Sequence, residues 1–279
     1  MRFMVMVKSN EKSEAGVLPD EKMLSAMGAY NEQLIKAGIM LAGDGLQASS
    51  KGTRVRISNK KTEIVDGPFA EAKELVGGFW LLKAGSKDEA VELLKKAPFK
   101  DGEVEIRPLY EAEDFGGPAD QPAPPPTPRK PGTKRYILLL KADKFTEAGG
   151  QPTEQLMTEM GDLMVELGSS GALLSGDGLK PSKEGARVVF TDGKRSVVDG
   201  PFTESKEIIA GFSIVQANTK EEAVEWGRRM LDIHMRGVGA TEGSLEVRLF
   251  FETEDFPVDP AEKPEGWRKQ ELDFRDKHS

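Results

Sequence analysis

The sequence predicts an α+β protein built from two copies of one domain, and three observations support this prediction. First, residues 2–94 align with residues 135–227 without a gap, with about 37 of 93 positions identical. Second, both copies alternate apolar runs typical of strands with stretches of helical periodicity. Third, residues 116–133, "GGPADQPAPPPTPRKPGT", hold seven prolines and predict an extended linker between the copies. A repeat of this length, present twice, indicates a domain duplication.

Each copy begins with a strand and a helix. The strands are "RFMVMVK" and "RYILLLK", whose nearly continuous apolar character predicts a central place in a sheet. Apolar side chains at spacings of three and four then predict a helix in each copy. Gly38 and Gly171 mark where these helices end. The spaced residues are Met23, Met27, Tyr30 and Leu34 in the first copy, and Leu156, Met160, Leu163 and Leu167 in the second.

The rest of each copy predicts a strand, a β-hairpin, a strand, a helix and a closing strand. "TRVRISNKKTEIVDG" and "ARVVFTDGKRSVVDG" are typical of hairpins, and Asp192-Gly193 supplies the preferred turn pair in the second. Ser86 with Glu89, and Thr219 with Glu222, predict capping boxes at the following helices. The order βαβ, hairpin, βαβ predicts a ferredoxin-like fold. The predicted domains are residues 1–115 and 134–256, joined by the linker at 116–133 and followed by a tail at 257–279.

The composition excludes several classes of function. The net charge is −8, and no region has the basic excess that nucleic-acid binding needs, so we expect no nucleic-acid partner. The apolar runs are too short to span a bilayer and the N-terminus lacks signal-peptide features, so we expect no membrane partner and a cytoplasmic location. There is no cysteine, and His234 and His278 are the two histidines. We therefore predict no metal site and no cofactor.

Three motifs resemble a known family. "DGPF" occurs at 66–69 and 199–202, "GDGL" at 43–46 and 176–179, and "EVEIRP" at 103–108. In this combination and order they resemble the YCII-related, DGPF-type domain, and the resemblance covers both copies. It implies a dimeric α+β barrel, in which two ferredoxin-like units set their sheets face to face. This chain is then expected to form tandem ferredoxin-like domains that pack as an intrachain pseudo-dimeric α+β barrel.

The resemblance also implies kinds of activity. Members of the same superfamily, such as muconolactone isomerase-like and dehydrochlorinase-like proteins, act on small organic acids or phenols. Many DGPF-type proteins have no known activity, and some occur beside alternative sigma factors. Several YCII-type proteins carry a histidine–aspartate pair proposed to be catalytic. Here the first copy has no histidine, and His234 falls in the region inserted in the second copy, so the resemblance does not extend to histidine-based chemistry.

Charged residues retained in both copies define the candidate site. The phrase "VDGPFAEAKELVGGF" at 65–79 recurs as "VDGPFTESKEIIAGF" at 198–212. On a structural interpretation, Asp-Gly-Pro is a strong turn, and Phe69 and Phe202 fill the core. On a functional interpretation, an aspartate is a general base and a cationic side chain holds a carboxylate or enolate. The predicted catalytic residues are Asp66, Asp199, Asp44 and Asp177, and the predicted substrate-binding residues are Arg54, Arg187, Lys73, Lys206, Glu71 and Glu204.

The sequence leaves three functions open. In the leading hypothesis, each half binds a small anionic or phenolic molecule, with cofactor-free acid–base chemistry of an isomerase or lyase type. The alternative is a non-enzymatic binding or regulatory module, linked to an alternative sigma factor. In the third, the repeated phrase only maintains the interface between the two halves. The halves are expected to pack on each other, and the sequence does not define further oligomerisation.

Overall fold

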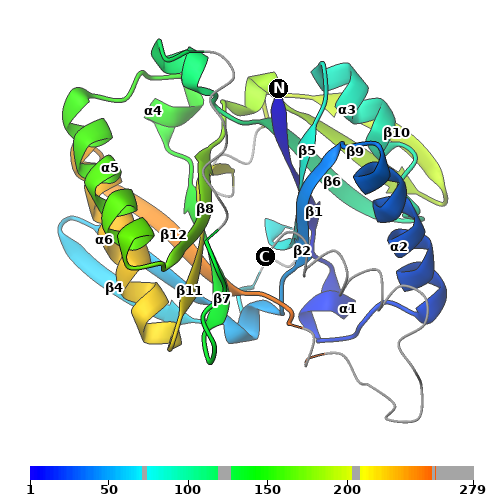
Figure 1. Cartoon of the computed structure of the whole chain (residues 1–279), viewed down its shortest axis with the longest axis horizontal. Coiled ribbons are helices and arrows are strands. Elements are labelled where there is room, and N and C mark those ends of the chain that lie inside the picture. Colours follow the sequence, from blue (N-terminus) through cyan, green and yellow to red (C-terminus); the bar gives the residue numbers. More distant parts are fainter. Residues whose placement is uncertain (71–73, 119–126, 203–207, 253–254, 256–279) are drawn as a thin grey trace.

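Two six-stranded antiparallel sheets face each other at the centre of the molecule, and helices cover their outer faces (Figure 1). The computed structural model describes residues 1–70, 74–118, 127–202, 208–252 and 255. On one side lie α2 (Glu21–Lys36) and α3 (Lys87–Leu94), and on the other lie α5 (Glu154–Ser169) and α6 (Lys220–Val238). This arrangement confirms the predicted α+β class and the pseudo-dimeric packing of two ferredoxin-like units.

The first copy contains the elements that its sequence predicts, in the predicted order. The hairpin turn at Asn59 and Lys60 has positive φ values of 50° and 65°, as a two-residue hairpin turn requires. A short helix, α1 (Glu11–Glu14), was not predicted. The strands are β1 (Arg2–Lys8), β2 (Met40–Gly45), β3 (Thr53–Ser58), β4 (Lys61–Asp66), β5 (Val76–Lys83) and β6 (Gly102–Pro108).

The second copy repeats this order, with one difference in a helix. The inserted residues extend α6, so that it has 19 residues where α3 has 8. His234 therefore lies within α6. The other elements are β7 (Lys134–Lys141), α4 (Lys144–Glu147), β8 (Leu173–Gly178), β9 (Ala186–Thr191), β10 (Lys194–Asp199), β11 (Ile209–Ala217) and β12 (Glu242–Leu249).

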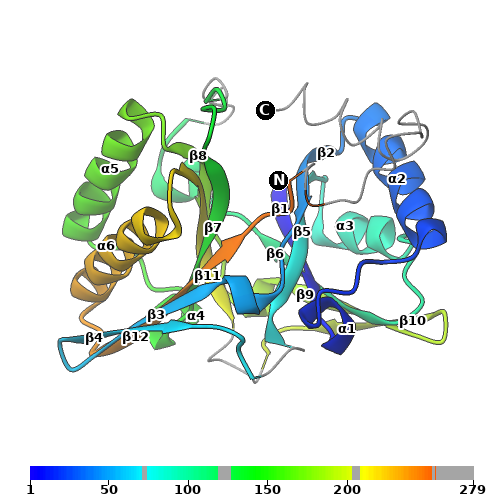
Figure 2. The same cartoon turned by 90° about the horizontal axis from the view of Figure 1, so that it is seen from below.

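The two copies exchange their hairpins. The first sheet has the order β10-β9-β6-β1-β5-β2, so it ends in the hairpin of the second copy. The second sheet has the order β4-β3-β12-β7-β11-β8, so it ends in the hairpin of the first copy. Figure 2 shows the hairpins extending beneath the helices of the opposite half. Each sheet is therefore a four-stranded ferredoxin-like sheet of one copy, extended by two strands of the other.

Three apolar layers hold the fold together. One lies between the first sheet and its helices, where Tyr30 and Leu34 of α2 pack on the strands. Another lies between the second sheet and its helices, where Leu163 and Leu167 of α5 pack. The third lies between the two sheets and combines residues of both copies, including Phe79 and Phe212. The burial of this middle layer favours packing of the two sheets against each other over two separate domains.

The predicted helix caps are present, with one difference in their bonding. Ser86 and Thr219 each accept a hydrogen bond from the backbone N–H three residues later. The carboxylates of Glu89 and Glu222 accept instead from the N–H of the residue before each cap, Gly85 and Asn218. The reciprocal bond of a capping box is therefore displaced by one residue.

Among the described residues, no helix is long and apolar enough to cross a membrane.

Candidate functional site

The repeated DGPF turn lies at the base of each exchanged hairpin. Its aspartate is mostly exposed and forms an ion pair with the opposite copy: Asp66 Oδ1 lies 2.7 Å from Lys220 Nζ, and Asp199 Oδ1 lies 2.6 Å from Lys87 Nζ. Asp66 also accepts a 2.6 Å hydrogen bond from the Thr53 hydroxyl. These contacts attach each hairpin to the first turn of a helix in the other half.

The phenylalanines of the turns pack against arginines. The Arg54 guanidinium lies 4.4 Å from the centre of the Phe69 ring, and that of Arg187 lies 4.0 Å from the centre of the Phe202 ring. Phe202 is buried, at 8% exposure, as predicted, whereas Phe69 is only partly buried. Neither ring belongs to the three apolar layers. Each instead forms a cation–π contact with a retained arginine of its own hairpin.

Each arginine reaches a buried group of charges on the closing strand of the opposite copy. In the first sheet, the Glu105 carboxylate lies 3.1 Å from Arg187 Nη2, 3.2 Å from Arg107 Nη1 and 3.4 Å from Lys8 Nζ. The side chains of Glu105 and Arg107 are each only 1% exposed. We call Lys8, Glu105, Arg107 and Arg187 the first-sheet cluster.

The second sheet holds the equivalent group. Glu246 Oε1 accepts a hydrogen bond from Arg54 and lies 3.1 Å from Lys141 Nζ. Its other oxygen lies 3.6 Å from Arg248 Nη1. We call Lys141, Glu246, Arg248 and Arg54 the second-sheet cluster. In both clusters, three cations from two copies surround one buried carboxylate.

A chain of hydrogen bonds and ion pairs connects each DGPF turn back to its cluster. In the half containing the first sheet, the Phe202 N–H donates to Ser182 Oγ, and the Ser182 hydroxyl donates to Glu147. Glu147 lies 3.5 Å from Arg107, which bonds to Glu105. The other half has a similar path. The Phe69 N–H donates to Ser49 Oγ, the Ser49 backbone N–H donates to Glu14, and Arg248 lies 3.6 Å from both Glu14 and Glu246.

The GDGL aspartates form a second set of contacts between the copies. Asp44 makes a two-pronged ion pair with Arg135, at 2.9 and 3.0 Å, and Asp177 makes the same pair with Arg2 at the same distances. Each arginine is the first or second residue of a central strand in the opposite copy. Glu252 and Glu111 provide further carboxylates to Arg135 and Arg2.

The environment shifts the pKa values of these carboxylates in different directions. Burial alone would raise the pKa of Glu246, but Lys141, Arg248 and Arg54 outweigh it and lower the pKa to about 2. Burial raises the pKa of Asp177 in spite of its bonds to Arg2. The hydrogen bonds from Lys220 and Thr53 lower the pKa of Asp66. Asp177 is thus a stronger proton acceptor than an ordinary aspartate, and Asp66 is a weaker one.

Those predicted site residues that the structure describes bond to separate partners. Asp66 bonds to Lys220, Asp44 to Arg135, and Arg54 to Glu246. Asp199, Asp177 and Arg187 have the equivalent separate partners in the other half. Four predicted substrate-binding residues, Glu71, Lys73, Glu204 and Lys206, lie outside the described residues.

Sequence reasoning missed the buried charges of the closing strands. The motif "EVEIRP" contains Glu105 and Arg107, but its alternation of charged and apolar residues is typical of a strand with one face in water. The signal that could have identified them is the recurrence of Glu and Arg two residues apart as Glu246 and Arg248.

A histidine–aspartate contact was also missed. His234 Nε2 lies 2.9 Å from Asp143 Oδ2, and the histidine side chain is 8% exposed. Burial would raise the pKa of Asp143, but the hydrogen bonds from His234 and Thr146 outweigh it and lower this pKa. The equivalent position in the first copy is Asn10, and that copy has no histidine, so the pair exists once.

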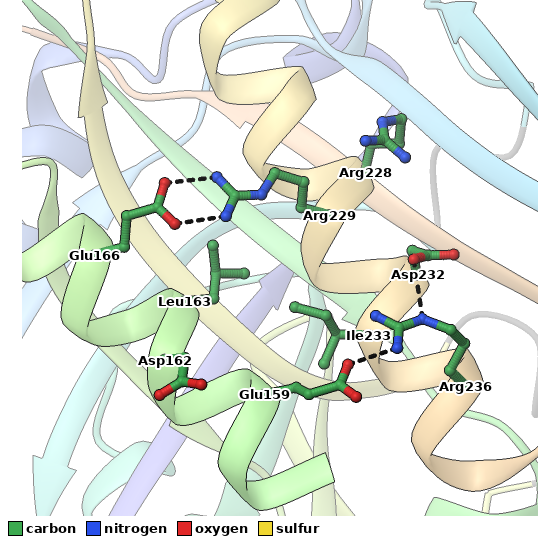
Figure 3. A pocket seen from close by; sticks show the side chains of 9 residues that line it. All are labelled: Glu159, Asp162, Leu163, Glu166, Arg228, Arg229, Asp232, Ile233 and Arg236. Carbon is green, nitrogen blue, oxygen red and sulfur yellow. Dashed lines mark hydrogen bonds and ion pairs between the residues drawn. The ribbon is translucent and has the colours of Figure 1, made fainter. Parts of the chain in front are cut away.

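A surface groove of about 350 Å³ lies between α5 and α6 (Figure 3). Leu163 and Ile233 form its floor, and charged side chains surround them. Arg229 makes a two-pronged pair with Glu166, and Arg236 pairs with Glu159 and Asp232. The predicted site residues do not line this groove. Its arginines are already neutralised, which leaves little charge to attract a ligand.

Comparisons with known proteins agree with the duplication. The YCII-related domain model matches the chain twice, at residues 1–113 and 135–233. An uncharacterised protein of Rhizobium meliloti (strain 1021) is 33% identical over 93 residues, which cover 32% of this chain and 75% of the relative. The two matches span most of the sequence, and the chain therefore belongs to the YCII-related domain family, with two copies of the domain in tandem.

Proposed function

We propose that the protein binds a small organic anion at the arginine-rich clusters between its two halves. The observation that carries the proposal is the position of Arg54 and Arg187. Each guanidinium lies against a phenylalanine ring and reaches a buried carboxylate, while 13% and 16% of the two side chains remain exposed. A planar guanidinium held at a solvent edge and close to further cations is well suited to a carboxylate or phenolate.

Acid–base chemistry is a further part of the proposal. A general base works best with a pKa near the working pH, so the raised pKa of Asp177 favours it for this role over Asp66, whose pKa is lowered. Both of its oxygens bond to Arg2, however, and a substrate would have to share that arginine. We therefore propose binding as the primary activity, and proton transfer by the aspartates Asp44, Asp66, Asp177 or Asp199 as secondary.

The alternative is a regulatory module in which the same binding occurs without chemistry. Its proposed connection with an alternative sigma factor comes from the family resemblance alone. Capture of a purified sigma factor by the immobilised protein, in the presence and absence of the bound anion, tests it. Capture that depends on the anion would support regulation, and anion binding without capture would favour the leading proposal.

Thermal unfolding in the presence of anions tests the leading proposal. Acetate, benzoate, salicylate and inorganic phosphate serve as probes. A ligand at ten times its Kd should stabilise the protein by about 1.4 kcal/mol, which shifts the melting temperature upward by about 3 °C. Arg54→Lys and Arg187→Lys keep the charge but remove the planar fork, so at least one should reduce the shift. Arg228→Gln, which changes a surface arginine paired with Glu225, is the control. Equal shifts in all variants would contradict the proposal.

A further inference from the structure

The two copies differ in one hydrogen bond between a central strand and a covering helix. In the first copy, the Trp80 indole N–H on β5 donates a 3.1 Å hydrogen bond to the side-chain oxygen of Asn31 on α2. The equivalent residues of the second copy, 133 positions later, are Ser213 on β11 and Met164 on α5. The strand still supplies a donor, but the facing group on the helix has changed from an amide oxygen to a thioether sulfur.

The Ser213 hydroxyl is buried beside two methionine sulfurs. Its oxygen lies 3.9 Å from Met164 Sδ and 3.8 Å from Met230 Sδ on α6, and the residue is 2% exposed. Within the described residues, these two sulfurs are the acceptors of the hydroxyl. A thioether sulfur is a weak acceptor, and burying a hydroxyl without a strong acceptor is costly. The second copy therefore holds a buried donor that an oxygen acceptor would satisfy better.

Oxidation of a methionine supplies such an oxygen. Hydrogen peroxide converts the thioether to a sulfoxide: the sulfur gains one oxygen atom, and the peroxide is reduced to water. The chain has 11 methionines and no cysteine, so thioethers are the sulfur groups that it offers to peroxide. Met164 is half-buried, whereas Met230 is 6% exposed, so peroxide reaches Met164 more readily. Because its side chain is unbranched and has three rotatable bonds, an oxygen on Met164 can turn toward Ser213.

We propose that Met164 is a site of reversible oxidation by hydrogen peroxide, and that the buried Ser213 hydroxyl donates a hydrogen bond to the sulfoxide oxygen. The oxidised second copy then has the strand-to-helix bond that Trp80 and Asn31 form in the first copy. A sulfoxide ordinarily disrupts an apolar core, because its oxygen is buried without a partner. Here the donor is already in place, so the oxidised protein keeps its fold. Neither residue belongs to the two arginine-rich clusters, so oxidation is independent of the proposed anion binding.

Met160 is the matched comparison on the same helix. It lies about one turn before Met164, and both side chains are half-buried against the same apolar layer. The hydrogen bonds to sulfur within the described residues go to Met164 and Met230, so Met160 lacks a hydroxyl donor. Met157, which is 47% exposed on this helix, serves as the reference for unhindered oxidation.

Peroxide treatment of the folded full chain tests the proposal, with peptide mass spectrometry to follow each methionine and thermal unfolding before and after oxidation. Met164 should become oxidised while the chain stays folded. Oxidation should lower the melting temperature by about 2–4 °C more in Ser213→Ala than in the parent, the effect of one hydrogen bond. Before oxidation, Ser213→Ala should melt at the parent temperature or above it, because the hydroxyl has weak acceptors. Met164→Leu should remove the difference that Ser213→Ala makes on oxidation, and Met160→Leu should leave it unchanged.

Three results would overturn the proposal. If oxidation lowers the melting temperature equally in the parent and in Ser213→Ala, the hydroxyl does not bind the sulfoxide. If Met164 is oxidised only after denaturant unfolds the chain, it is not a site in the folded protein. Methionine sulfoxide reductases should remove the added oxygen from Met164 and restore the parent melting temperature, and oxygen that persists there would contradict reversibility.

Discussion

Gly67 approaches the backbone of the preceding loop so closely that a Cβ atom built on it would lie 1.9 Å from the carbonyl oxygen of Ser49. Gly200 has the same relation to Ser182, also at 1.9 Å. No side chain fits at either position unless the backbone moves. The glycine of DGPF thus has a steric role that is independent of any ligand, and it brings the following phenylalanine N–H to the serine hydroxyl.

Gly67→Ala should therefore destabilise the protein strongly. Overpacking a close contact typically costs about 1–3 kcal/mol, and a contact with rigid backbone lies at the upper end of that range. Gly161→Ala is the matched control, because Gly161 is helical and has open space around it, so alanine should be neutral or slightly stabilising. Urea denaturation of both variants measures the difference. Equal stability would show that the Ser49 loop can move aside.

The low pKa of Glu246 predicts how stability depends on pH. The carboxylate is held charged down to about pH 2, whereas in the unfolded chain it titrates near the ordinary glutamate value of 4.5. A lowered pKa contributes stability that is complete above the unfolded pKa and is lost as pH falls through the folded pKa. Unfolding free energy should thus fall between about pH 4.5 and pH 2, partly because of this residue.

Glu246→Gln should flatten that part of the pH profile. At neutral pH the variant should be destabilised by about 3–5 kcal/mol, since it leaves buried cations without their shared carboxylate. Denaturant unfolding at several pH values measures both effects. Glu166→Gln, which changes an exposed carboxylate paired with Arg229, is the control. A profile as steep as that of the parent would show that Glu246 does not contribute to acid sensitivity.

Burial of charge on the closing strands could not be predicted from the residue pattern. Alternation in "EVEIRP" correctly predicts that Val104 and Ile106 face the core, but the other face looks solvent-exposed. That face is buried among side chains of both copies, including Arg187 of the adjoining hairpin and Glu147. The local sequence of a strand carries no information on which side chains of the other copy will pack against it. The retained Arg54 and Arg187 were identified from the repeat, whereas their partners Glu246 and Glu105 were not.

At the scale of elements, the strands and long helices follow their sequence signals closely. The predicted apolar runs match β1 and β7, and the Asp192-Gly193 turn has the positive φ values, 49° and 76°, that its residues favour. The partner of each hairpin was not predictable, because both copies offer the same edge strand. A hairpin that pairs with β6 or with β12 satisfies the same backbone hydrogen-bonding groups. Which of the two strands it pairs with depends on how the two halves pack.

The two-pronged ion pairs clamp an edge strand of one sheet to a central strand of the other. Asp44 on β2 binds Arg135 on β7, and Asp177 on β8 binds Arg2 on β1. The Asp44–Arg135 pair is the more buried, with side-chain exposures of 13% and 12% against 18% and 34% for Asp177 and Arg2. Charge-assisted ion pairs that have less contact with solvent are screened less by salt, and they contribute more to the stability of the fold.

Double-mutant cycles should rank the two clamps in that order. Asp44→Asn with Arg135→Gln should give a coupling energy of about 1–3 kcal/mol, in the upper range for directly bonded groups. Asp177→Asn with Arg2→Gln should give a smaller value that decreases further with added salt. Thermal or urea unfolding provides the four stabilities in each cycle. A larger coupling for the Asp177 pair would contradict this account.

At the scale of the whole molecule, hairpin exchange makes the two copies depend on each other. Three of the cations that form ion pairs between the copies are retained in both: Arg2 matches Arg135, Lys87 matches Lys220, and Arg54 matches Arg187. Two molecules of the first copy could therefore make the same ion pairs across a twofold axis that the two halves make within one chain.

Residues 1–115 expressed alone should thus form a homodimer by exchanging hairpins. A monomer would leave its own hairpin without a sheet and would expose the apolar layer between the sheets. Sedimentation or light scattering measures the mass. The variant Asp44→Arg in the same fragment places like charges opposite Arg2 and should weaken the dimer. A stable folded monomer would show that the hairpin can return to its own sheet.

The exchanged hairpins also constrain the order in which the protein can fold as it is synthesised. The first copy leaves the ribosome with β3 and β4 complete, but their pairing partner β12 ends at Leu249, near the end of the described chain. The sheet of the first copy in turn waits for β9, which begins at Ala186. For much of translation, the nascent chain therefore carries an unpaired hairpin and an open sheet edge. Premature pairing between neighbouring nascent chains on one messenger RNA is the expected error, and the linker favours the partner within the same chain.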